Sequence, residues 1–324
     1  MSTTEPRSPA NAQQAAPQVM VFGPSPFVSV TVERVVSGGE GDEIHFHAAG
    51  QGVWVARAAA RLGARSTLVT AAGGEHGTIL RALLQGEPFG TIAVDVAGEG
   101  AAYIDDRRAG DRRRVAERPA DVLSRHELDD LYGAALSVGL GVDSVVLCGT
   151  GESPRLPSDL YRRIAHDLRE HGVRVVADLA GGFALAAARG GLDVLKVSVS
   201  EAAELGIGPV DTPADLARLA QRLRALGAER VVVSRGDAPA LAVDERDVLE
   251  LEAPQFEEAD HRGAGDSMTA ALAVGLAAGN PWTAVVGRAV AAGAANVTRH
   301  GLGTSSAAEV DVLEPRVRVA RLEV

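Results

Sequence analysis

Strand-like and helix-like segments alternate along most of this chain, and that alternation restricts the possible folds more than any other feature. Short runs rich in β-branched residues lie at 18–22, 66–70, 143–148, 173–179, 193–199 and 229–234. Amphipathic stretches typical of helices separate several of these runs, at 51–63, 158–172 and 212–227. Such an order places successive strands parallel in one sheet. The predicted fold class is α/β, with a mostly parallel central sheet flanked by helices on both faces.

Two regions break this alternation. Residues 27–50 and 91–115 alternate apolar and polar residues with a period of two and contain Gly and Asp turns, which is typical of antiparallel hairpins. We predict that hairpins at about 27–48 and 91–116 form a small β-sheet beside the main one. Ligands of open α/β sheets bind beyond the carboxyl ends of the strands, so a side sheet in that place acts as a lid.

The pattern predicts one domain over residues 18–324, preceded by a disordered tail. Residues 1–17 are rich in Pro, Ala and Gln and lack the features of a signal peptide. No uninterrupted apolar stretch reaches the roughly 20 residues of a membrane span. The net charge of −11 argues against nucleic acid or an anionic membrane as a partner. We expect a cytoplasmic protein that binds small molecules.

Cysteine and lysine are both scarce. The single cysteine, Cys148, excludes an intramolecular disulfide and a cysteine-based zinc site, and we expect it to pack at a strand end. Lys196 is the only lysine. Either it is a chance survivor of a bias toward arginine, or a site requires a compact ammonium rather than a planar guanidinium.

The segment with most chemical content is HRGAGDSMTAALAVGL, residues 261–276. A helix that begins at Gly263-Ala264-Gly265-Asp266 points its unpaired N–H groups and the positive end of its dipole at one place, which suits an anion. Asp266 beside that place can accept a hydroxyl proton, and phosphoryl transfer needs charge neutralisation and an aligned nucleophile. The alternative is a helix start whose acid only favours the dipole.

Other phosphate-binding motifs are absent from the sequence. The chain contains no GxxxxGK[ST], no complete GxGxxG and no set of protein-kinase motifs. A nucleotide bound here is therefore held neither by a P-loop nor by a Rossmann turn.

Two segments resemble the signatures of the ribokinase-like (PfkB) carbohydrate kinases, closest to the branch of 1-phosphofructokinase and tagatose-6-phosphate kinase. The C-terminal signature, usually D-T-x-G-A-G-D-S, reads DHRGAGDS at 260–267. The N-terminal signature, usually A-G-G-K-G-x-N-V-A-R-x-L-x-x-L-G, reads AAGQGVWVARAAARLG at 48–63. The resemblance covers nearly the whole chain after residue 18. It implies one α/β domain with a β-lid, which phosphorylates a hydroxyl of a sugar or sugar-like molecule with ATP.

The resemblance also implies roles for the helix start. Gly263, Ala264 and Gly265 would form the anion hole for the transferred phosphoryl group, and Asp266 would be the general base.

Further roles on the nucleotide side follow from a second motif, K-P-N-x-x-E. Lys196 matches its lysine, which faces the nucleotide phosphates, and Glu201 matches its acid, which holds Mg²⁺ through water. Val197 and Ser198 replace the proline and the asparagine. The Ser198 hydroxyl can still bind water.

Two later segments resemble the family's nucleotide-binding loops. VVVSRGDAPALAV, residues 231–243, resembles the S-x-G-x-x-G-A loop, with Ser234 and Gly236 kept and Pro239 in place of the later glycine. AAGAANVTRHGLGTSS, residues 291–306, resembles the segment that walls the adenine and, in many members, binds a monovalent cation such as K⁺. Its candidates are Asn296 for the nucleotide, with Gly301 and Ser305 for the cation.

The acceptor side departs from the family pattern. Gln51 stands in place of a lysine that grips the substrate, Trp54 replaces an asparagine, and Phe27 replaces the sugar-binding aspartate of N-P-A-x-D. The lid segment that normally offers a phosphate-binding arginine has none at 97–102. The predicted substrate-binding residues are Phe27, Gly50, Gln51 and Trp54.

These departures predict a different acceptor, because mismatched polar groups cost discrimination. Fructose 1-phosphate, fructose 6-phosphate and tagatose 6-phosphate should be poor substrates, and a neutral polyol, cyclitol or nucleoside should be better. Phe27 and Trp54 either stack on the acceptor or pack lid against helix. The arginines of DDRRAGDRRR, residues 105–114, either supply positive charge over the substrate or belong to a solvated hairpin tip.

A second class of function stays open at this point. A nucleotide- or ligand-binding protein that keeps the fold without transfer activity would explain Ser198, Pro239 and the altered pocket, and a nucleoside kinase is a variant of the enzyme hypothesis.

The lid also predicts the assembly. Apolar residues on one face of VSVTVERVV favour pairing of two lids in a homodimer, which the resemblance implies as well. In the neighbouring strand, His45 and His47 alternate with Ile44 and Phe46, so one of these two pairs faces the cleft.

Overall fold

The computed structural model describes residues 15–35, 41–149, 156–254, 262–297 and 302–323. The predicted disordered tail, residues 1–17, lies outside these ranges except for residues 15–17, which precede the first strand. Within the described ranges no helix is both long and apolar enough to cross a membrane.

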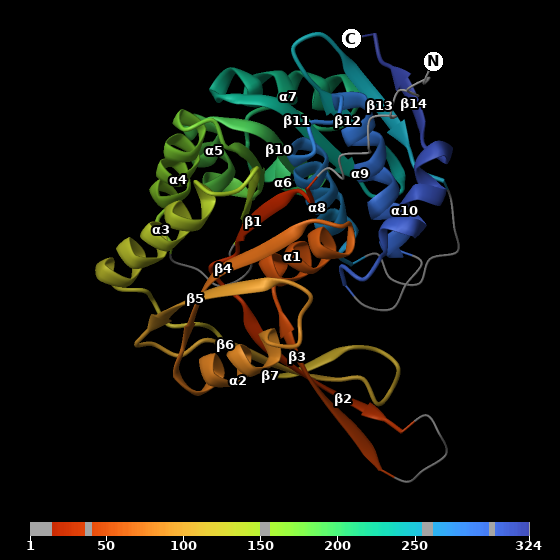
Figure 1. The fold of residues 1–324 in the computed structure, drawn as a ribbon. Coiled ribbons are helices and arrows are strands. Elements are labelled where there is room, and N and C mark those ends of the chain that lie inside the picture. Colours follow the sequence, from red (N-terminus) through yellow and green to blue (C-terminus); the bar gives the residue numbers. More distant parts are fainter. Residues whose placement is uncertain (1–14, 36–40, 150–155, 255–261, 298–301, 324) are drawn as a thin grey trace, which may run out of the picture.

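The body of the molecule is built on a ten-stranded sheet with the order β14-β13-β12-β11-β10-β9-β8-β1-β4-β5 (Figure 1). Neighbouring strands are parallel from β11 to β5 and antiparallel from β11 to β14. The predicted, mostly parallel sheet is confirmed. Its strands are β1 (Gln18–Phe22), β4 (Arg65–Gly73), β5 (Gly90–Val96), β8 (Ser144–Cys148), β9 (Arg174–Asp178), β10 (Leu192–Ser198), β11 (Ala228–Arg235), β12 (Ala238–Val243), β13 (Val248–Glu252) and β14 (Arg318–Arg321).

Helices cover both faces of this sheet (Figure 1). The central strands are buried on both sides, which explains their continuous runs of Val, Leu and Ala. One hydrophobic core joins the sheet to α1 (Gln51–Arg61), α8 (Ala264–Ala277), α9 (Trp282–Val297) and α10 (Ala307–Leu313). The other core joins it to α3 (Arg125–Gly139), α4 (Ser158–Glu170), α5 (Gly181–Gly190) and α7 (Pro213–Leu226). The remaining helical elements are α2 (Gly74–Leu84), α6 (Val199–Glu204) and η1 (Glu314–Arg316).

Local sequence signals set the ends of these helices. α7 occupies the amphipathic stretch predicted at 212–227 and begins with Thr212 as N-cap and Pro213 in the first turn. The Thr212 hydroxyl accepts a hydrogen bond from the N–H of Asp215 at 3.1 Å, and the Asp215 carboxylate accepts one from the N–H of Thr212. The helix ends at Gly227, whose φ of 131° suits glycine.

A four-stranded sheet forms the lid, with the order β3-β2-β6-β7. It consists of two hairpins, β2 (Phe27–Arg34) with β3 (Asp42–Ala49), and β6 (Ala101–Asp106) with β7 (Arg113–Arg118). Parallel pairing of β2 with β6 joins the hairpins into one sheet. Figure 1 shows this sheet projecting from the body below α1.

The predicted start of the second lid hairpin, at residue 91, needs correction. β5 pairs in parallel with β4 at the edge of the large sheet, so the lid hairpin begins at Ala101. The period of two suits both a lid strand and an edge strand with one covered face. The pattern alone therefore could not separate the two.

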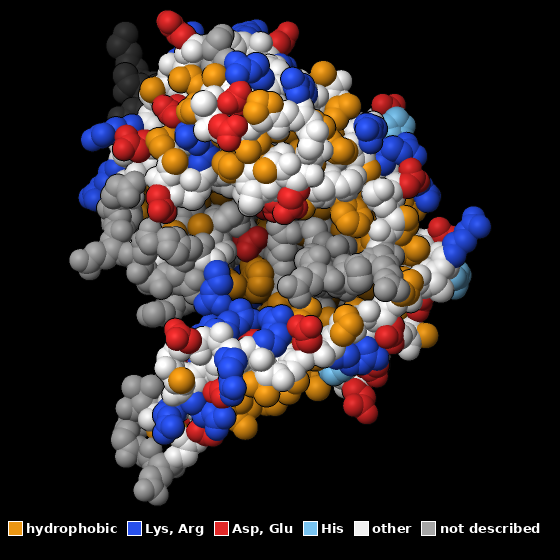
Figure 2. All heavy atoms as spheres, turned by 180° about the vertical axis from the view of Figure 1, so that it is seen from behind, with side chains coloured by type: hydrophobic (Ala, Val, Ile, Leu, Met, Phe, Trp, Pro, Cys, Tyr) orange, Lys and Arg blue, Asp and Glu red, His pale blue; other side chains and the backbone are white. Residues whose placement is uncertain are grey.

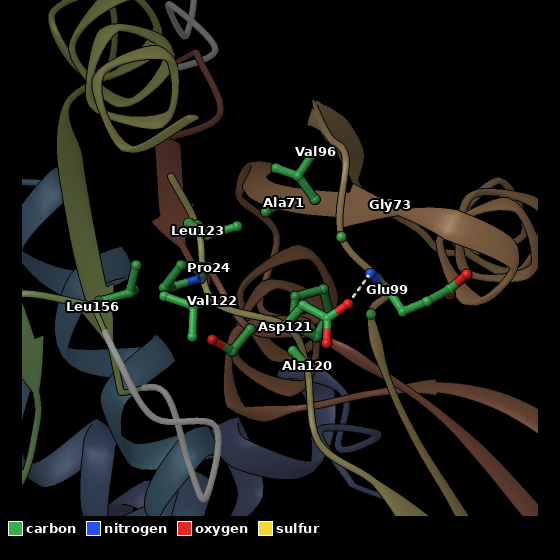
Figure 3. A pocket seen from close by; sticks show the side chains of 14 residues that line it. Pro24, Ala71, Gly73, Val96, Glu99, Ala120, Asp121, Val122, Leu123 and Leu156 are labelled. Atoms are coloured by element: carbon green, nitrogen blue, oxygen red, sulfur yellow. Dashed lines mark hydrogen bonds between the residues drawn. The ribbon is translucent and has the colours of Figure 1, made fainter. Parts of the chain in front are cut away.

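The segments that connect lid and body meet around a small apolar pocket of about 50 Å³ (Figure 3). Glu99 and Asp121 link two of these segments, because the Glu99 N–H donates to Asp121 Oδ2 and the Asp121 N–H donates to the Glu99 carbonyl, each at 2.9 Å. The Glu99 side chain points away from the pocket in Figure 3 and accepts a hydrogen bond from the N–H of Glu75, in the first turn of α2, at 3.1 Å. The lid connection is thereby fixed to the body.

Candidate active site

The helix start predicted from the sequence is present at α8. Gly263 is its N-cap and has a left-handed φ of 78°, a conformation that glycine adopts without strain. A side chain at Gly263 would also begin 3.0 Å from Leu302. The preceding residues of the signature, Asp260 and His261, lie outside the described ranges. No side-chain cap hydrogen bond is formed at this helix start among the described residues, which suits an anion site.

Asp266 lines a cleft of about 590 Å³ between the lid and the body, which we call the Asp266 cleft. All the predicted substrate-binding residues line it together with Asp266, namely Phe27, Gly50, Gln51 and Trp54. The lid contributes Phe27 from β2, and α1 contributes Gln51 and Trp54 from its first turn. The sequence thus identified residues from distant segments that share one cavity.

Four aromatic rings line this cleft, although aromatic residues make up only 3% of the chain. Phe27 makes edge contacts with Trp54 at 6.2 Å and with Tyr103 at 4.6 Å between ring centroids. Phe183 from α5 lines the opposite side. Phe27 and Trp54 therefore both pack lid against helix and face the cavity. Sequence reasoning missed Tyr103 and Phe183, because nothing in their local pattern marks the cavity.

A second cleft, of about 260 Å³, lies on the other side of the α8 start, and we call it the Ser234 cleft. Ser234, near the end of β11, and Gly236, in the turn between β11 and β12, line it. Ala264 and Gly265 line it as well, whereas Asp266 lines the first cleft. The two clefts therefore meet at the first turn of α8.

The single lysine lies beneath this turn in a buried ion pair. Lys196 Nζ donates to both carboxylate oxygens of Asp178, at 3.1 and 3.2 Å, and the Thr269 hydroxyl donates to the same carboxylate at 2.6 Å. Any side chain at Gly265 would begin only 2.8 Å from Lys196 Nζ, so the glycine makes room for the ammonium. Burial disfavours the charge, but the carboxylates of Asp178, Glu201 and Asp266 raise the pKa of Lys196 above its usual value.

Asp178 is a site residue that the sequence reasoning missed. It is the last residue of β9, it is buried, and it lines the Asp266 cleft. Its position offered one signal, since ligand-binding residues in open α/β sheets stand at the carboxyl ends of strands.

The titration of Asp266 is shifted by its surroundings. Burial, together with the nearby Asp178, raises the pKa of Asp266 to about 7, although Lys196 and a hydrogen bond from Gln51 act in the opposite direction. A carboxylate with a pKa near neutrality can both accept and release a proton at physiological pH.

Ser198 and Glu201 form a capping box at the start of α6. The Ser198 N–H and hydroxyl donate to Glu201 Oε2 at 2.7 and 2.8 Å. Glu201 also lines the Asp266 cleft. Among the described residues there is no group of three or more His, Cys, Asp or Glu side chains that could hold a metal directly. The water-mediated magnesium contact expected for Glu201 stays a prediction.

Asn296 and Ser305 are both buried near the α8 start. Asn296 accepts hydrogen bonds from the Ser267 hydroxyl and the Gly303 N–H, and it donates to the Arg262 carbonyl. It therefore ties loops to α8 and does not line the Ser234 cleft. The Ser305 hydroxyl has no hydrogen-bond partner within the described part of the chain. Gly301 lies outside the described ranges.

The lid arginines are paired with the lid's own acids. Arg107 pairs with Glu33 and Arg108 with Asp42. At the hairpin tip, Arg113 pairs with Asp106. The guanidinium of Arg114 lies 4.1 Å above the ring of Tyr103, which lines the Asp266 cleft. Figure 2 shows Lys and Arg side chains along the lid where it faces the hollow. The arginines at the hairpin tip are thus solvated and paired within the lid. Of the four arginines named here, Arg114 is the one that stacks on a ring of the cleft.

The alternation in β3 is also resolved. Ile44 and Phe46 are exposed on the outer face of the lid, at 59% and 51%. His45 and His47 stack on each other and pair across the sheet with Thr31 and Ser29, on the same face as Phe27. Burial, His45 and the nearby Arg57 of α1 lower the pKa of His47. The histidines therefore face the body.

Two clefts that meet at a glycine-rich helix start, under a lid and at the carboxyl ends of a parallel sheet, define a ribokinase-like small-molecule kinase. Comparison with known proteins names the family. The model of the pfkB family of carbohydrate kinases matches residues 17–309, and the chain belongs to that family. It is a phosphotransferase with a hydroxyl acceptor.

Relatives in two branches of the family are similar over most of their length. An ATP-dependent 6-phosphofructokinase isozyme 2 of Mycobacterium tuberculosis is 29% identical over 94% of this chain and 91% of its own. A 1-phosphofructokinase of Bacillus subtilis is 27% identical over 84% and 88%. Phosphofructokinase-2 from Escherichia coli, solved in complex with potassium, shares the fold with a TM-score of 0.81 over 92% and 98% of the chains, at 24% identity.

The raised pKa of Asp266 predicts that Asp266→Asn stabilises the protein. A carboxyl whose pKa is about 7 in the folded state and about 4 in the unfolded chain opposes folding above pH 4, and its full cost is reached above pH 7. The neutral amide removes this cost. We expect a gain of about 1–2 kcal/mol in the free energy of unfolding at pH 8, measured by urea denaturation, that shrinks toward zero near pH 4. An unchanged or lower stability at pH 8 would contradict the assignment.

Proposed function

We propose that this carbohydrate kinase transfers the terminal phosphoryl group of ATP, bound in the Ser234 cleft, to a hydroxyl of a sugar-like acceptor in the Asp266 cleft. The observation that carries the proposal is the meeting of the two clefts at the first turn of α8. A phosphoryl group passing from one to the other must cross the N–H groups of that turn.

The chemistry assigned to each side follows from this arrangement. Asp266 takes the proton of the acceptor hydroxyl while the hydroxyl oxygen attacks the terminal phosphorus of ATP and ADP leaves. The backbone N–H groups of Gly263, Ala264 and Gly265 stabilise the charge that develops on the transferred group. The buried ammonium of Lys196 adds a fixed positive charge beneath the same turn, and Ser234 and Gly236 border the nucleotide.

Two ions complete the proposed site. Mg²⁺, held through water by Glu201 with Ser198 beside it, would neutralise charge on the phosphates. The unpartnered hydroxyl of Ser305 suits a monovalent cation such as K⁺ next to the nucleotide, and Asn296 would act there by holding the loops in place.

The acceptor that fits the cleft is neutral and carries a ring. Among the described residues that line the Asp266 cleft there is no lysine or arginine, whereas Phe27, Trp54 and Tyr103 present aromatic surfaces. The relatives are named as phosphofructokinases, so a sugar phosphate is the competing candidate. Arg114 is the group best placed to receive its phosphate. A nucleoside would also suit the aromatic surfaces.

Asp266→Asn tests the transfer step itself. Loss of the general base should lower kcat by about 10²–10⁴-fold and leave the affinity for ATP within about threefold, because Asp266 lines the other cleft. Turnover is measured as ADP release over a panel of sugars, sugar phosphates and nucleosides, and ATP binding by calorimetry. Wild-type turnover in the variant would contradict the proposal. ATP binding by the wild type without transfer to any acceptor would instead favour a binding protein.

Competition kinetics tests the acceptor. We expect kcat/KM to be higher for a neutral polyol, cyclitol or nucleoside than for fructose 1-phosphate, fructose 6-phosphate or tagatose 6-phosphate, since the cleft lacks a charged clamp. A sugar phosphate that exceeds every neutral acceptor, and that Arg114→Met weakens while the matched change Arg113→Met does not, would reverse this assignment. Arg113 is the control because it is 76% exposed at the hairpin tip.

The outer face of the lid supports a homodimer. Ile44, Phe46 and Ile104 expose apolar side chains there, and Figure 2 shows hydrophobic side chains along this side of the lid. Burying such a patch against a second lid would remove it from water. Phe46→Glu should convert a dimer to a monomer in sedimentation, and Val312→Glu, at an equally exposed position on α10, should not. A wild-type protein that stays monomeric at all concentrations would exclude the dimer.

A further inference from the structure

Gln51 is held in one orientation at the edge of the Asp266 cleft. It is the first residue of α1 and follows Gly50, whose φ of 118° turns the chain from the lid into the helix. Its side-chain oxygen Oε1 accepts the N–H of Gly149, which follows β8, at 2.6 Å. This bond connects the start of α1 to the carboxyl end of the central strand. The amide plane of Gln51 is therefore set by a backbone donor.

The orientation of that amide decides what Gln51 offers to the cleft. A carboxamide has one acceptor end and one donor end. Because Oε1 is occupied by Gly149, the Nε2 end is the one left to donate to a group in the cleft. Gln51 and Asp266 line the same cleft, and α1 packs against α8. A hydrogen bond from the Gln51 side chain is one of the effects that lower the pKa of Asp266.

We propose that Gln51 is a positioning residue for Asp266: its amide, locked by Gly149, donates to the carboxylate and holds it facing the acceptor hydroxyl. This inference rests on the proposed function, in which Asp266 is the general base. An unfixed carboxylate can rotate toward Lys196 instead, and an oxygen turned that way is lost to the acceptor.

The charged groups around Asp266 make the proposal testable, because the pKa of Asp266 can be raised or lowered by the residue at position 51. Asp178 from β9 and Glu201 from α6 disfavour its ionised form, and Lys196 from β10 favours it. Gln51 faces it from α1 and contributes a neutral donor. An apolar residue at position 51 removes a hydrogen bond to the ionised form and raises the pKa of Asp266. A lysine there adds a positive charge and lowers it.

The experiment compares Gln51→Met and Gln51→Lys with the wild type. We expect the acidic limb of the kcat/KM profile for the acceptor to move up by about one pH unit in the first variant and down by about one in the second. In Gln51→Met we also expect kcat to fall about tenfold to a hundredfold, with a smaller change in the KM for ATP. Gln85→Met is the matched control, because Gln85 is exposed at the end of α2 and should leave both limb and kcat unchanged.

A readout without turnover separates failure of this inference from failure of the proposed function. The carboxyl ¹³C resonance of Asp266, identified by its absence from Asp266→Asn, reports the pKa directly in the ATP-free protein. If the resonance and the pH limb stay in place in both Gln51 variants while Asp266→Asn is inactive, Asp266 is the base and Gln51 does not position it. If Asp266→Asn is active, the base assignment itself is wrong. Thermal unfolding checks that each variant is folded, and Gln51→Lys alone suffices if Gln51→Met is not.

Discussion

The buried pair of Lys196 and Asp178 is the interaction on which the site depends. An ammonium and a carboxylate are tolerated in a protein interior only when they are paired and their remaining hydrogen-bonding positions are filled. Here Asp178 receives both Lys196 and the Thr269 hydroxyl, so the ends of β9 and β10 are tied to the first turns of α8. The same pair requires a glycine at position 265, because the ammonium fills the space of a side chain. The glycine that suits an anion thus also suits the lysine.

This arrangement sets the electrostatics of Asp266. The carboxylate is close to one positive and several negative groups in a place with little water, and its pKa of about 7 is the balance of those effects. A group in this state costs stability, as functional sites commonly do, but it gains the ability to exchange protons near neutral pH. In the proposed function, the proton that Asp266 accepts comes from an acceptor hydroxyl bound in the Asp266 cleft.

The sequence predicted those parts of the molecule that depend on local or repeating patterns. The alternation of strands and helices gave the parallel sheet, the Thr212 and Gly227 signals gave the ends of α7, and Gly263 to Asp266 identified the helix start. Tyr103 and Phe183 were missed because each is marked only by contacts with residues far along the chain, and Asp178 because its one signal, a place at the carboxyl end of a strand, is shared by many other residues. The lid boundary near residue 91 failed for a different reason, since a period of two does not say which sheet a strand joins.

The arginines of the lid lie near the site, but their charges are already paired with acids of the lid. Asp105 is almost fully buried, and although burial acts to raise its pKa, hydrogen bonds and charge from Arg112 and Arg114 hold that pKa below its usual value. An anionic acceptor would have to compete with Asp105 for Arg114, which also stacks on the ring of Tyr103. A phosphate bound at Arg114 would therefore replace an ion pair that the folded protein already has, so its net gain would be smaller than at an unpaired arginine. The pairing within the lid is thus a second argument for the proposed neutral acceptor, beside the residues that the pocket has lost.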